Sequence, residues 1–246
     1  MYAIQQDRIS DEFVSAWKCA GMHIQKMGQE GVHWVRASLY QPMAEHLSFR
    51  LGNQLFFVFV ESVASPFSEG AKKLFMHICD QARATPCLLP MKKSGQVYEP
   101  AIPGWGFIHA VTGAPVDAFE MVSDALIEMS DWELHDFAVQ IVCDHLEKQG
   151  NSLMSRQSDL MIDPSLWFTD KSGPHWVVVR AIRYPASRAM LPSNIEAIKQ
   201  SCAVKSKSGF FASVAVASDK NQDTDETVPL YRGHGMIVSF RGLEQV

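Results

Sequence analysis

The residues best suited to chemistry are arginines and aspartates in the second half of the chain. Arg180 interrupts an apolar run, and an arginine in a buried strand needs a partner for its charge. Asp163 would serve as an internal partner, whereas an anion or a nucleic-acid backbone would serve as an external one. Both interpretations stay open at this stage. The candidate ligand-binding residues are Arg180, Arg183, Arg188 and Arg232.

Asp159 and Asp163 form a second candidate group, because neighbouring carboxylates can hold a divalent metal that activates water. Together with Arg180 they would form the catalytic set of an enzyme. The structural interpretation is that Asp163 is a turn residue before a proline and that Asp159 is an exposed strand residue. We favour this interpretation and expect no catalytic residues, no metal and no cofactor.

Other motifs for catalysis are missing from the sequence. The nine histidines form no HxH or HExxH pair, and no GxSxG nucleophile elbow occurs. Gly104-Trp105-Gly106 and Gly233-His234-Gly235 lack the spacing of a phosphate-binding loop. The five cysteines are widely spaced without a CxxC pair, which argues against a zinc site or a disulfide framework.

Hydrophobic periodicity predicts the elements that position these residues. Ser130-Asp131-Trp132-Glu133 has the form of a capping box, and the helix that it opens is closed by Gly150. A similar helix runs from Ser10 to Gly28. Three strands, a helix and two more strands are expected to follow each one. The expected ranges are 32–40, 46–51, 55–61, 69–82, 85–91 and 105–111 in the first half, and 153–162, 166–169, 175–182, 193–203, 210–217 and 236–240 in the second.

The two halves match in several segments that occur in the same order. Pro100, Gly104, Gly106 and Gly113 have the spacing of Pro229, Gly233, Gly235 and Gly242. Ordered matches of this kind indicate repetition. We therefore predict an α+β fold with an internal duplication of an αβββαββ module, in which two lobes have mixed sheets flanked by helices. The expected parts are a first lobe at residues 1–115, a connecting helix at 116–129 and a second lobe at 130–246, with 218–228 as a mobile hairpin loop.

The order of elements from Glu133 to about Val216 resembles the core of the PD-(D/E)xK, or restriction-endonuclease-like, superfamily. That family needs an acidic residue at the second strand and Glu/Asp-x-Lys on the third, because these side chains hold the metal and position water. Asp163-Pro164 stands where the first acid would be, but Val177-Val178-Val179-Arg180 places valine at the second metal ligand. Valine cannot bind magnesium. The resemblance implies a nuclease-like fold with a degenerate catalytic motif.

The order of elements in residues 10–129 is also similar to that of type III secretion chaperones. This resemblance implies a non-enzymatic protein that binds extended client segments. Such chaperones act as dimers, and a tandem duplication would place an equivalent pair within one chain.

Composition narrows the classes of function. A net charge of −5 argues against a general binder of nucleic acid or membrane surfaces, although a local basic groove is compatible with it. No stretch approaches the ~20 apolar residues of a membrane span, and the N-terminus lacks the pattern of a signal peptide. We expect a cytoplasmic, non-enzymatic binding or scaffold protein whose partner is another protein, bound near the interface of the lobes. The alternative is a diverged nuclease-like or DNA-binding protein that uses the second lobe.

Overall fold

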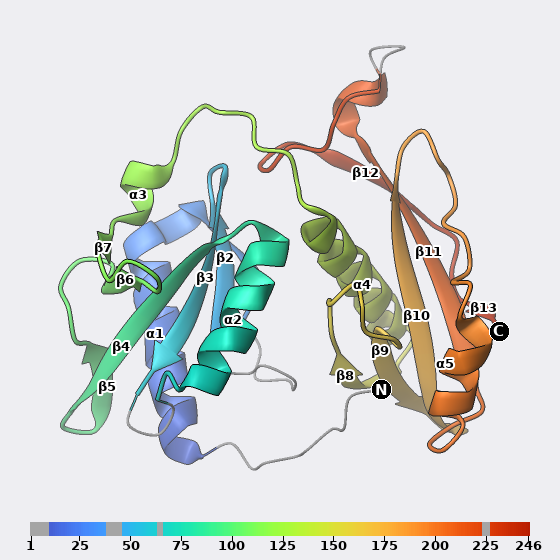
Figure 1. Cartoon of the computed structure of the whole chain (residues 1–246), viewed down its shortest axis with the longest axis horizontal. Helices are drawn as coiled ribbons and strands as arrows, with labels where there is room; N and C mark the ends of the chain where they lie inside the picture. The colour runs from blue at the N-terminus through green and yellow to red at the C-terminus, as the bar shows by residue number, and fades with distance from the viewer. Residues whose placement is uncertain (1–9, 38–45, 63–65, 223–226) are drawn as a thin grey trace. The chain divides into compact units, whose positions relative to one another are not determined.

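The computed structural model divides the chain into two compact units, residues 5–127 and residues 128–246 (Figure 1). The structure describes residues 10–37, 46–62, 66–222 and 227–246. Within these residues each unit combines helices with a mixed sheet and has its own hydrophobic core. The predicted α+β class with two sheet lobes is confirmed.

The unit at residues 5–127 begins with a helix whose first amides are capped by Ser10, as predicted. Its elements are α1 (Asp11–Gly28), β1 (Val32–Arg36), β2 (His46–Leu51), β3 (Gln54–Glu61), α2 (Glu69–Ala82), β4 (Thr85–Ser94), β5 (Val97–Pro100), β6 (Phe107–His109), β7 (Pro115–Val116) and α3 (Ala118–Met121). The sheet order is β1-β2-β3-β4-β6-β7, with β5 paired to β4. Among the described strands of this unit only the β3–β4 pairing is parallel, because α2 carries the chain across the sheet between these two strands.

Both faces of this first sheet are buried, because successive side chains of a strand point to opposite faces. Phe56 and Val58 of β3 belong to the core cluster that also contains Ala16 and Trp17 of α1. Phe59, on the other face, meets Phe75 of α2 with the ring centroids 5.8 Å apart in an edge-on arrangement. The run of apolar residues in β3 therefore forms a strand that is buried on both faces.

The unit at residues 128–246 opens with the predicted capping box, in which Ser130 and Glu133 each accept a backbone N–H of the other. Its elements are α4 (Asp131–Lys148), β8 (Ser152–Arg156), β9 (Leu166–Asp170), β10 (Gly173–Arg183), α5 (Ile195–Cys202), β11 (Gly209–Ser218), the 3-10 helix η2 (Asp219–Gln222), β12 (Met236–Phe240) and β13 (Glu244–Gln245). The sheet order is β12-β11-β10-β9-β8, with β13 paired to β11.

The second sheet also lies between two helices. Val177 and Val179 of β10 share a core cluster with residues of α4, whereas Trp176 and Val178 share another with Ile198 of α5. β10 pairs with β9 only up to Val177 but stays paired with β11 as far as Arg183. The second half of β10 therefore extends past β9, and residues of α4 and of the segment before β9 lie beside it.

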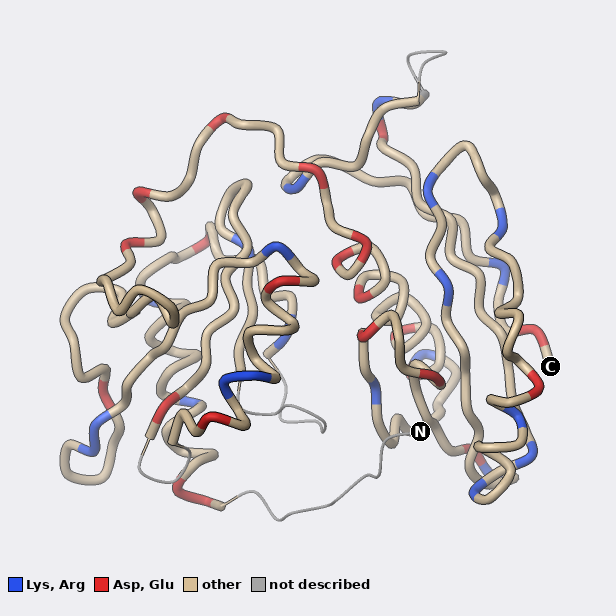
Figure 2. Tube along the Cα trace, in the orientation of Figure 1, with Lys and Arg blue, Asp and Glu red and all other residues tan. Residues whose placement is uncertain are grey.

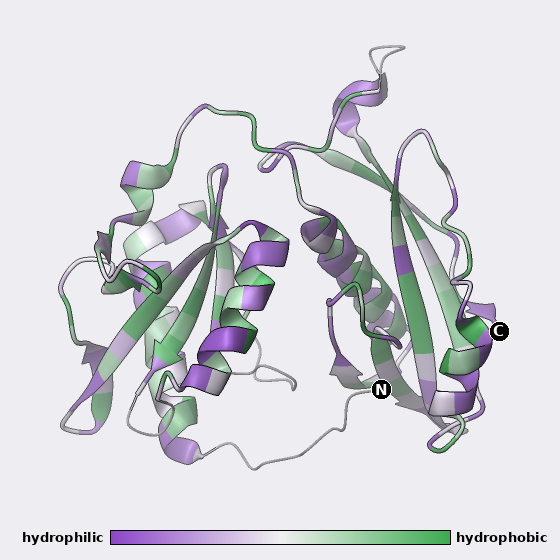
Figure 3. Cartoon of the chain, viewed as in Figure 1, coloured by the Kyte–Doolittle hydropathy of each residue, from purple (hydrophilic) through white to green (hydrophobic). Residues whose placement is uncertain are grey.

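Apolar residues concentrate on the strands of both sheets, and the helices present their polar residues on one side (Figure 3). This distribution is that of sheets covered by amphipathic helices. No helix in the described part of the chain has the length and the apolarity needed to cross a membrane.

The two units share one sheet topology. Strands β1-β2-β3-β4-β6 and β8-β9-β10-β11-β12 follow the same succession of antiparallel, antiparallel, parallel and antiparallel pairings. Gly104 and Gly233, which match in the sequence, both have positive φ, at 71° and 83°. Two modules of common design would share this strand order and these glycine conformations. Their origin by duplication stays a prediction.

The predicted connecting helix at residues 116–129 is wrong beyond its first turn. Asp117 caps a helix, but that helix ends at Met121. Asn53, in the turn between β2 and β3, donates to the carbonyl of Ala125 at 2.8 Å and accepts from the N–H of Ser123 at 3.2 Å. These bonds satisfy backbone groups outside a helix, so the following segment stays irregular.

The predicted strand at residues 153–162 ends at Arg156, because the next side chain makes a turn possible. Gln157 accepts the N–H of Asp159 at 2.6 Å, and its own amide group donates to carbonyls further along the turn. The turn then covers α4, where the Ser158 hydroxyl donates to Asp136. Asp136 is therefore buried.

Smaller differences occur at the ends of elements. The strand expected at 105–111 is limited to Phe107–His109, and β5, β7 and β13 were not predicted. The loop expected at 218–228 contains the short helix η2, and its residues 223–226 lie outside the described residues. The same is true of residues 38–40 of the first predicted strand.

Candidate functional site

A cavity of about 440 Å³ lies beside the second half of β10 in the unit at residues 128–246. This volume is within the usual range for a small-ligand site. Figure 2 shows acidic residues along α4, and basic residues on β10 and on the segment that follows it. The cavity thus combines charged and apolar walls. Its lining residues are Asp131, Leu134, His135, Leu160, Arg180, Ala181, Ile182 and Arg183.

Arg180 is held by Asp163 in a two-bond ion pair. Its Nη1 and Nη2 donate to the two carboxylate oxygens of Asp163 at 3.0 and 2.6 Å, and Nη1 also donates to the carbonyl of Val179 at 2.8 Å. The side chains are 26% and 11% exposed, so both charges are largely removed from water. The internal partner that the sequence suggested is therefore present. Arg180 lines the cavity with its charge already balanced.

Arg183 is held at two of its three nitrogens. Nη1 pairs with the carboxylate of Asp131, and Nη2 donates to the carbonyl of Met129 at 2.8 Å. Both contacts come from the start of α4. The Nε atom is buried and has no hydrogen-bond partner within the described structure. An arginine Nε–H remains a donor at all ordinary pH values, so this atom keeps an unused hydrogen-bonding capacity.

His135 is the most deeply buried ionisable side chain in the cavity lining, at 2% exposure. Its Nε2 has no hydrogen-bond partner among the described residues. Burial, and secondarily the positive charge of Arg180, lower the pKa of His135 to about 4, against an opposing effect of Asp163 and Asp159. The imidazole is therefore neutral at pH 7, and its Nε2 makes no hydrogen bond to the described part of the protein.

We predict that His135 makes the unit at residues 128–246 less stable in acid. The unfolded chain protonates this histidine near pH 6.5, whereas the folded chain does so only near pH 4, so the unfolded state binds more protons between these values. Stability therefore rises with pH across this window. The shift corresponds to a loss of about 3 kcal/mol as the pH falls from 7 to below 4. Urea unfolding at a series of pH values measures it.

His135→Leu is the matched variant for this prediction, because leucine fills a similar volume and does not titrate. The difference in unfolding free energy between the two proteins isolates His135, since the other titrating groups contribute to both. We expect the difference to change by about 3 kcal/mol between pH 7 and pH 4. A difference that is constant over this range contradicts the prediction.

The remaining candidate residues lie apart from the cavity lining. Arg188 is exposed and pairs with Glu244. Arg232 is 4% exposed and is bound by both oxygens of Glu133, so it is part of the interior. Asp159 accepts the N–H of Met161 at 2.8 Å in a turn, not in the strand that was expected. Of the four arginines, the structure brings only Arg180 and Arg183 together at the cavity.

The positions that the nuclease-like resemblance assigns to metal ligands have other roles. Both oxygens of Asp163 bind Arg180, and Val178 and Val179 are fully buried in opposite core clusters. Among the described residues, no group of three or more His, Cys, Asp or Glu side chains is arranged to hold a metal ion.

His135 and Asp131 were not identified from the sequence as site residues. A signal for Asp131 existed, because an acid in the first turn of a helix can attract an arginine from a neighbouring strand. His135 gave no such signal. Leu160, which lines the same cavity, belongs to the turn at residues 157–165, which the sequence assigned largely to a strand.

The unit at residues 128–246 is thus a mixed sheet between two helices, with a partly apolar cavity at one end of its central strand. Most of this unit, residues 132–246, matches a family model described as a domain of unknown function (DUF8840). No curated protein and no solved structure matches the chain. The matched stretch contains every residue of the cavity lining except Asp131.

Proposed function

We propose that this chain is a binding protein for another protein, and that its cavity accepts an amide group of that client. One observation carries the proposal. Arg183 Nε and His135 Nε2, on two residues of the cavity lining, are buried and have no hydrogen-bond partner within the described structure. A buried polar atom without a partner costs about 1–3 kcal/mol. A ligand that reaches both atoms removes this cost.

The balance of charge favours a neutral ligand. Arg180 is paired with Asp163 and Arg183 with Asp131, so these two cations are already matched by two carboxylates. His135 is neutral at pH 7 because burial lowers its pKa to about 4. An added anion would be left without a matching charge and would compete with Asp131 for Arg183. The charge pattern therefore supports an amide rather than a phosphate or a carboxylate.

An amide also has the two hydrogen-bonding functions that the unpaired atoms need. Its carbonyl oxygen accepts from the Nε–H of Arg183, and its N–H donates to the neutral imidazole of His135 when Nε2 carries no proton. Leu134, Leu160 and Ile182 give the cavity apolar walls suited to an aliphatic stem. Peptide bonds and the side chains of Asn and Gln present this combination, which is why the proposed partner is a polypeptide.

We place this function in the cytoplasm. All five cysteines are free, and four of them are buried. Unpaired thiols are typical of proteins kept under reducing conditions. The cytoplasmic location is part of the proposal, and it implies that the client is a protein within the cell.

Titration with a small amide tests the proposal directly. We expect propionamide to bind in the millimolar range, as is usual for a ligand of so few atoms, and to shift the Nε–Hε resonance of Arg183 and the ring resonances of His135 in NMR spectra. Propionate and inorganic phosphate, used at equal concentration, should cause smaller shifts. Arg183→Lys, which keeps the charge but removes the Nε donor, should weaken the binding of propionamide by roughly tenfold.

Arg188→Lys is the matched control, because Arg188 lies outside the cavity lining and pairs with Glu244. It should bind propionamide as the unchanged protein does. Larger shifts with phosphate, together with salt-dependent binding of an oligonucleotide, would support the nucleic-acid alternative instead. Cleavage of that oligonucleotide with added Mg²⁺, lost in Asp163→Ala, would support the nuclease-like one. An unchanged Arg183 resonance at saturating propionamide contradicts the proposal.

A further inference from the structure

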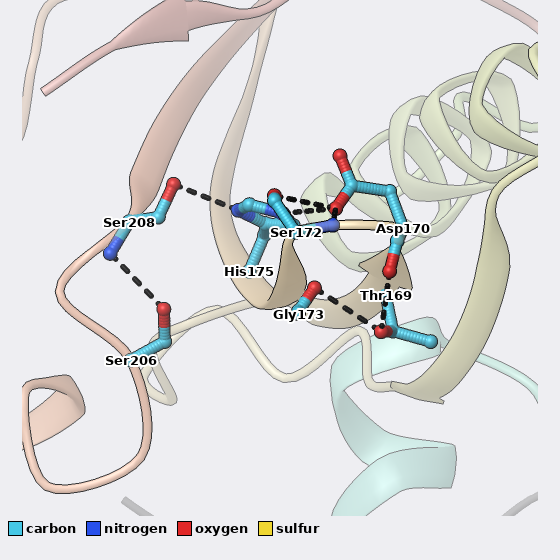
Figure 4. Close-up of polar contacts among 7 residues, drawn as sticks. All are labelled: Thr169, Asp170, Ser172, Gly173, His175, Ser206 and Ser208. Carbon is cyan, nitrogen blue, oxygen red and sulfur yellow. Dashed lines mark hydrogen bonds and ion pairs between the residues drawn. The ribbon is translucent and has the colours of Figure 1, made fainter.

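Three residues at one end of the second sheet form a continuous hydrogen-bonded chain. His175 Nδ1 lies 2.7 Å from the Oγ of Ser208, and His175 Nε2 lies 2.8 Å from Oδ1 of Asp170. Figure 4 shows the imidazole between the serine and the carboxylate. Asp170 ends β9, His175 lies near the start of β10, and Ser208 directly precedes β11. Three adjacent strands thus bring together a hydroxyl, an imidazole and a carboxylate.

The carboxylate determines the direction of these hydrogen bonds. Oδ1 of Asp170 also accepts from the Oγ and the N–H of Ser172, at 2.6 and 2.7 Å. Hydrogen bonds from the Ser172 side chain, from His175 and from the Ser172 backbone hold the pKa of Asp170 well below its usual range. An ionised carboxylate only accepts, so Nε2 is the nitrogen that donates to it. In the tautomer whose single ring proton is on Nε2, Nδ1 has a free lone pair, and the Ser208 hydroxyl donates to it.

The imidazole and the serine are both fixed in position. The ring of His175 is stacked on Phe168 with the centroids 4.9 Å apart, and its side chain is 9% exposed. The Ser208 carbonyl accepts from Trp176 N at 3.2 Å, and the Ser208 N–H donates to the Oγ of Ser206 at 3.0 Å. Ser208 itself is only half-buried. A base that is held in place beside the hydroxyl of a half-buried serine is the arrangement that activates a nucleophile.

We propose that Ser208 is a nucleophile that His175 and Asp170 activate, and that it accepts acyl groups from esters or thioesters. The Oγ of Ser208 forms a bond to the acyl carbon, and the bond from that carbon to the leaving oxygen or sulfur breaks. The proton of the hydroxyl passes to Nδ1 of His175 and from there to the leaving group. Water that attacks the resulting ester through the same base restores the serine. No oxidant, reductant or metal takes part.

The ring nitrogens of His175 have the opposite roles to those in serine proteases, where Nε2 faces the serine. Proton transfer needs one free lone pair facing the hydroxyl and one N–H held by the carboxylate. The reversed ring supplies both. The proposal is independent of the cavity, since none of these three residues lines it.

The same contacts also fasten the segment at residues 203–208 to the start of β10, and this structural role by itself predicts no unusual reactivity. Measuring the reactivity of Ser208 distinguishes the catalytic role from the purely structural one. We expect a fluorophosphonate probe, incubated with the full chain, to form an adduct that peptide mass spectrometry maps to Ser208. His175→Gln should slow its formation by about 10²–10⁴-fold, as is usual when a general base is removed.

Asp170→Asn provides a second variant, because a carboxamide can donate to Nε2 and so favours the wrong tautomer of His175 with little change of shape. It should also slow the labelling. Ser201→Ala, which removes an exposed hydroxyl on α5, should leave it unchanged. Circular dichroism identifies the variants that remain folded.

Replacement of Ser208 by cysteine gives a readout that a purely structural role does not affect. Iodoacetamide should alkylate Ser208→Cys faster than it alkylates the double variant Ser208→Cys/His175→Gln, because only the first has a base beside the thiol. The proposal is overturned when Ser208 carries no adduct in the folded chain. An adduct that forms as fast in folded His175→Gln or Asp170→Asn overturns it as well, since Ser208 would then be merely accessible.

Discussion

Glu133→Ala is expected to lower the free energy of unfolding of the unit at residues 128–246 by about 3–5 kcal/mol. Glu133 has two roles at the start of α4. Its Oε2 accepts the backbone N–H of Ser130 at 2.9 Å, which completes the capping box. Its two oxygens also bind Nε and Nη2 of Arg232 at 2.9 and 2.8 Å. The side chains of Arg232 and Glu133 are 3% and 9% exposed, so the variant leaves a cation buried without its carboxylate.

Hydrogen exchange of the α4 amides is the suitable measurement, because a chain with two units can unfold in more than one step. Glu147→Ala, at an exposed position of the same helix, should change stability by no more than about 0.5 kcal/mol. Glu133→Leu combined with Arg232→Met should recover part of the loss, because an apolar pair needs no charge partner. Equal effects of Glu133→Ala and Glu147→Ala would show that the ion pair contributes nothing.

Local signals in the sequence predicted most of the elements. The range of α2 was predicted as Glu69–Ala82, and the capping box at Ser130 and Glu133 was recognised, because both depend on neighbouring residues. The failures occur where a distant side chain replaces a local bond. Asn53 ends α3 early by binding backbone groups about 70 residues further along the chain. No pattern within residues 116–129 contains that information.

At the candidate site, too, contacts signalled by local sequence were predicted and contacts between distant residues were missed. The need of Arg180 for a partner was apparent from its place in an apolar run, and Asp163 was the expected internal partner. Arg232 was grouped with Arg180 by charge alone, but it binds Glu133, 99 residues away in the sequence. The chain of Asp170, His175 and Ser208 was also missed. The turn between β9 and β10 brings Asp170 near His175, but Ser208 comes close only through the parallel pairing of β10 with β11.

The parallel pairing of β10 with β11 leads to the second large effect, at Gly209. This residue lies opposite Trp176, whose ring is fully buried, and a Cβ added to Gly209 would lie 2.0 Å from Cζ2 of that ring. The ring has little room to withdraw, because its Nε1 donates to the carbonyl of Ser206 at 3.2 Å. Gly209→Ala is therefore expected to lower the free energy of unfolding of this unit by about 3 kcal/mol, the upper part of the range for overpacking.

Two further variants distinguish this contact from a general effect of removing a glycine. Gly21 lies within α1, and a Cβ added there meets nothing within 4 Å. Gly21→Ala should therefore stabilise its own unit by about 1 kcal/mol, the opposite sign for the same chemical change. In the second variant, Trp176→Phe, the ring atoms that Gly209 approaches are removed, so adding Gly209→Ala to it should cost less than in the unchanged protein. A double-mutant cycle measures this coupling. Gly209→Ala could instead cost the same stability in the unchanged protein and in Trp176→Phe. That result would show that the Trp176 ring does not restrict Gly209.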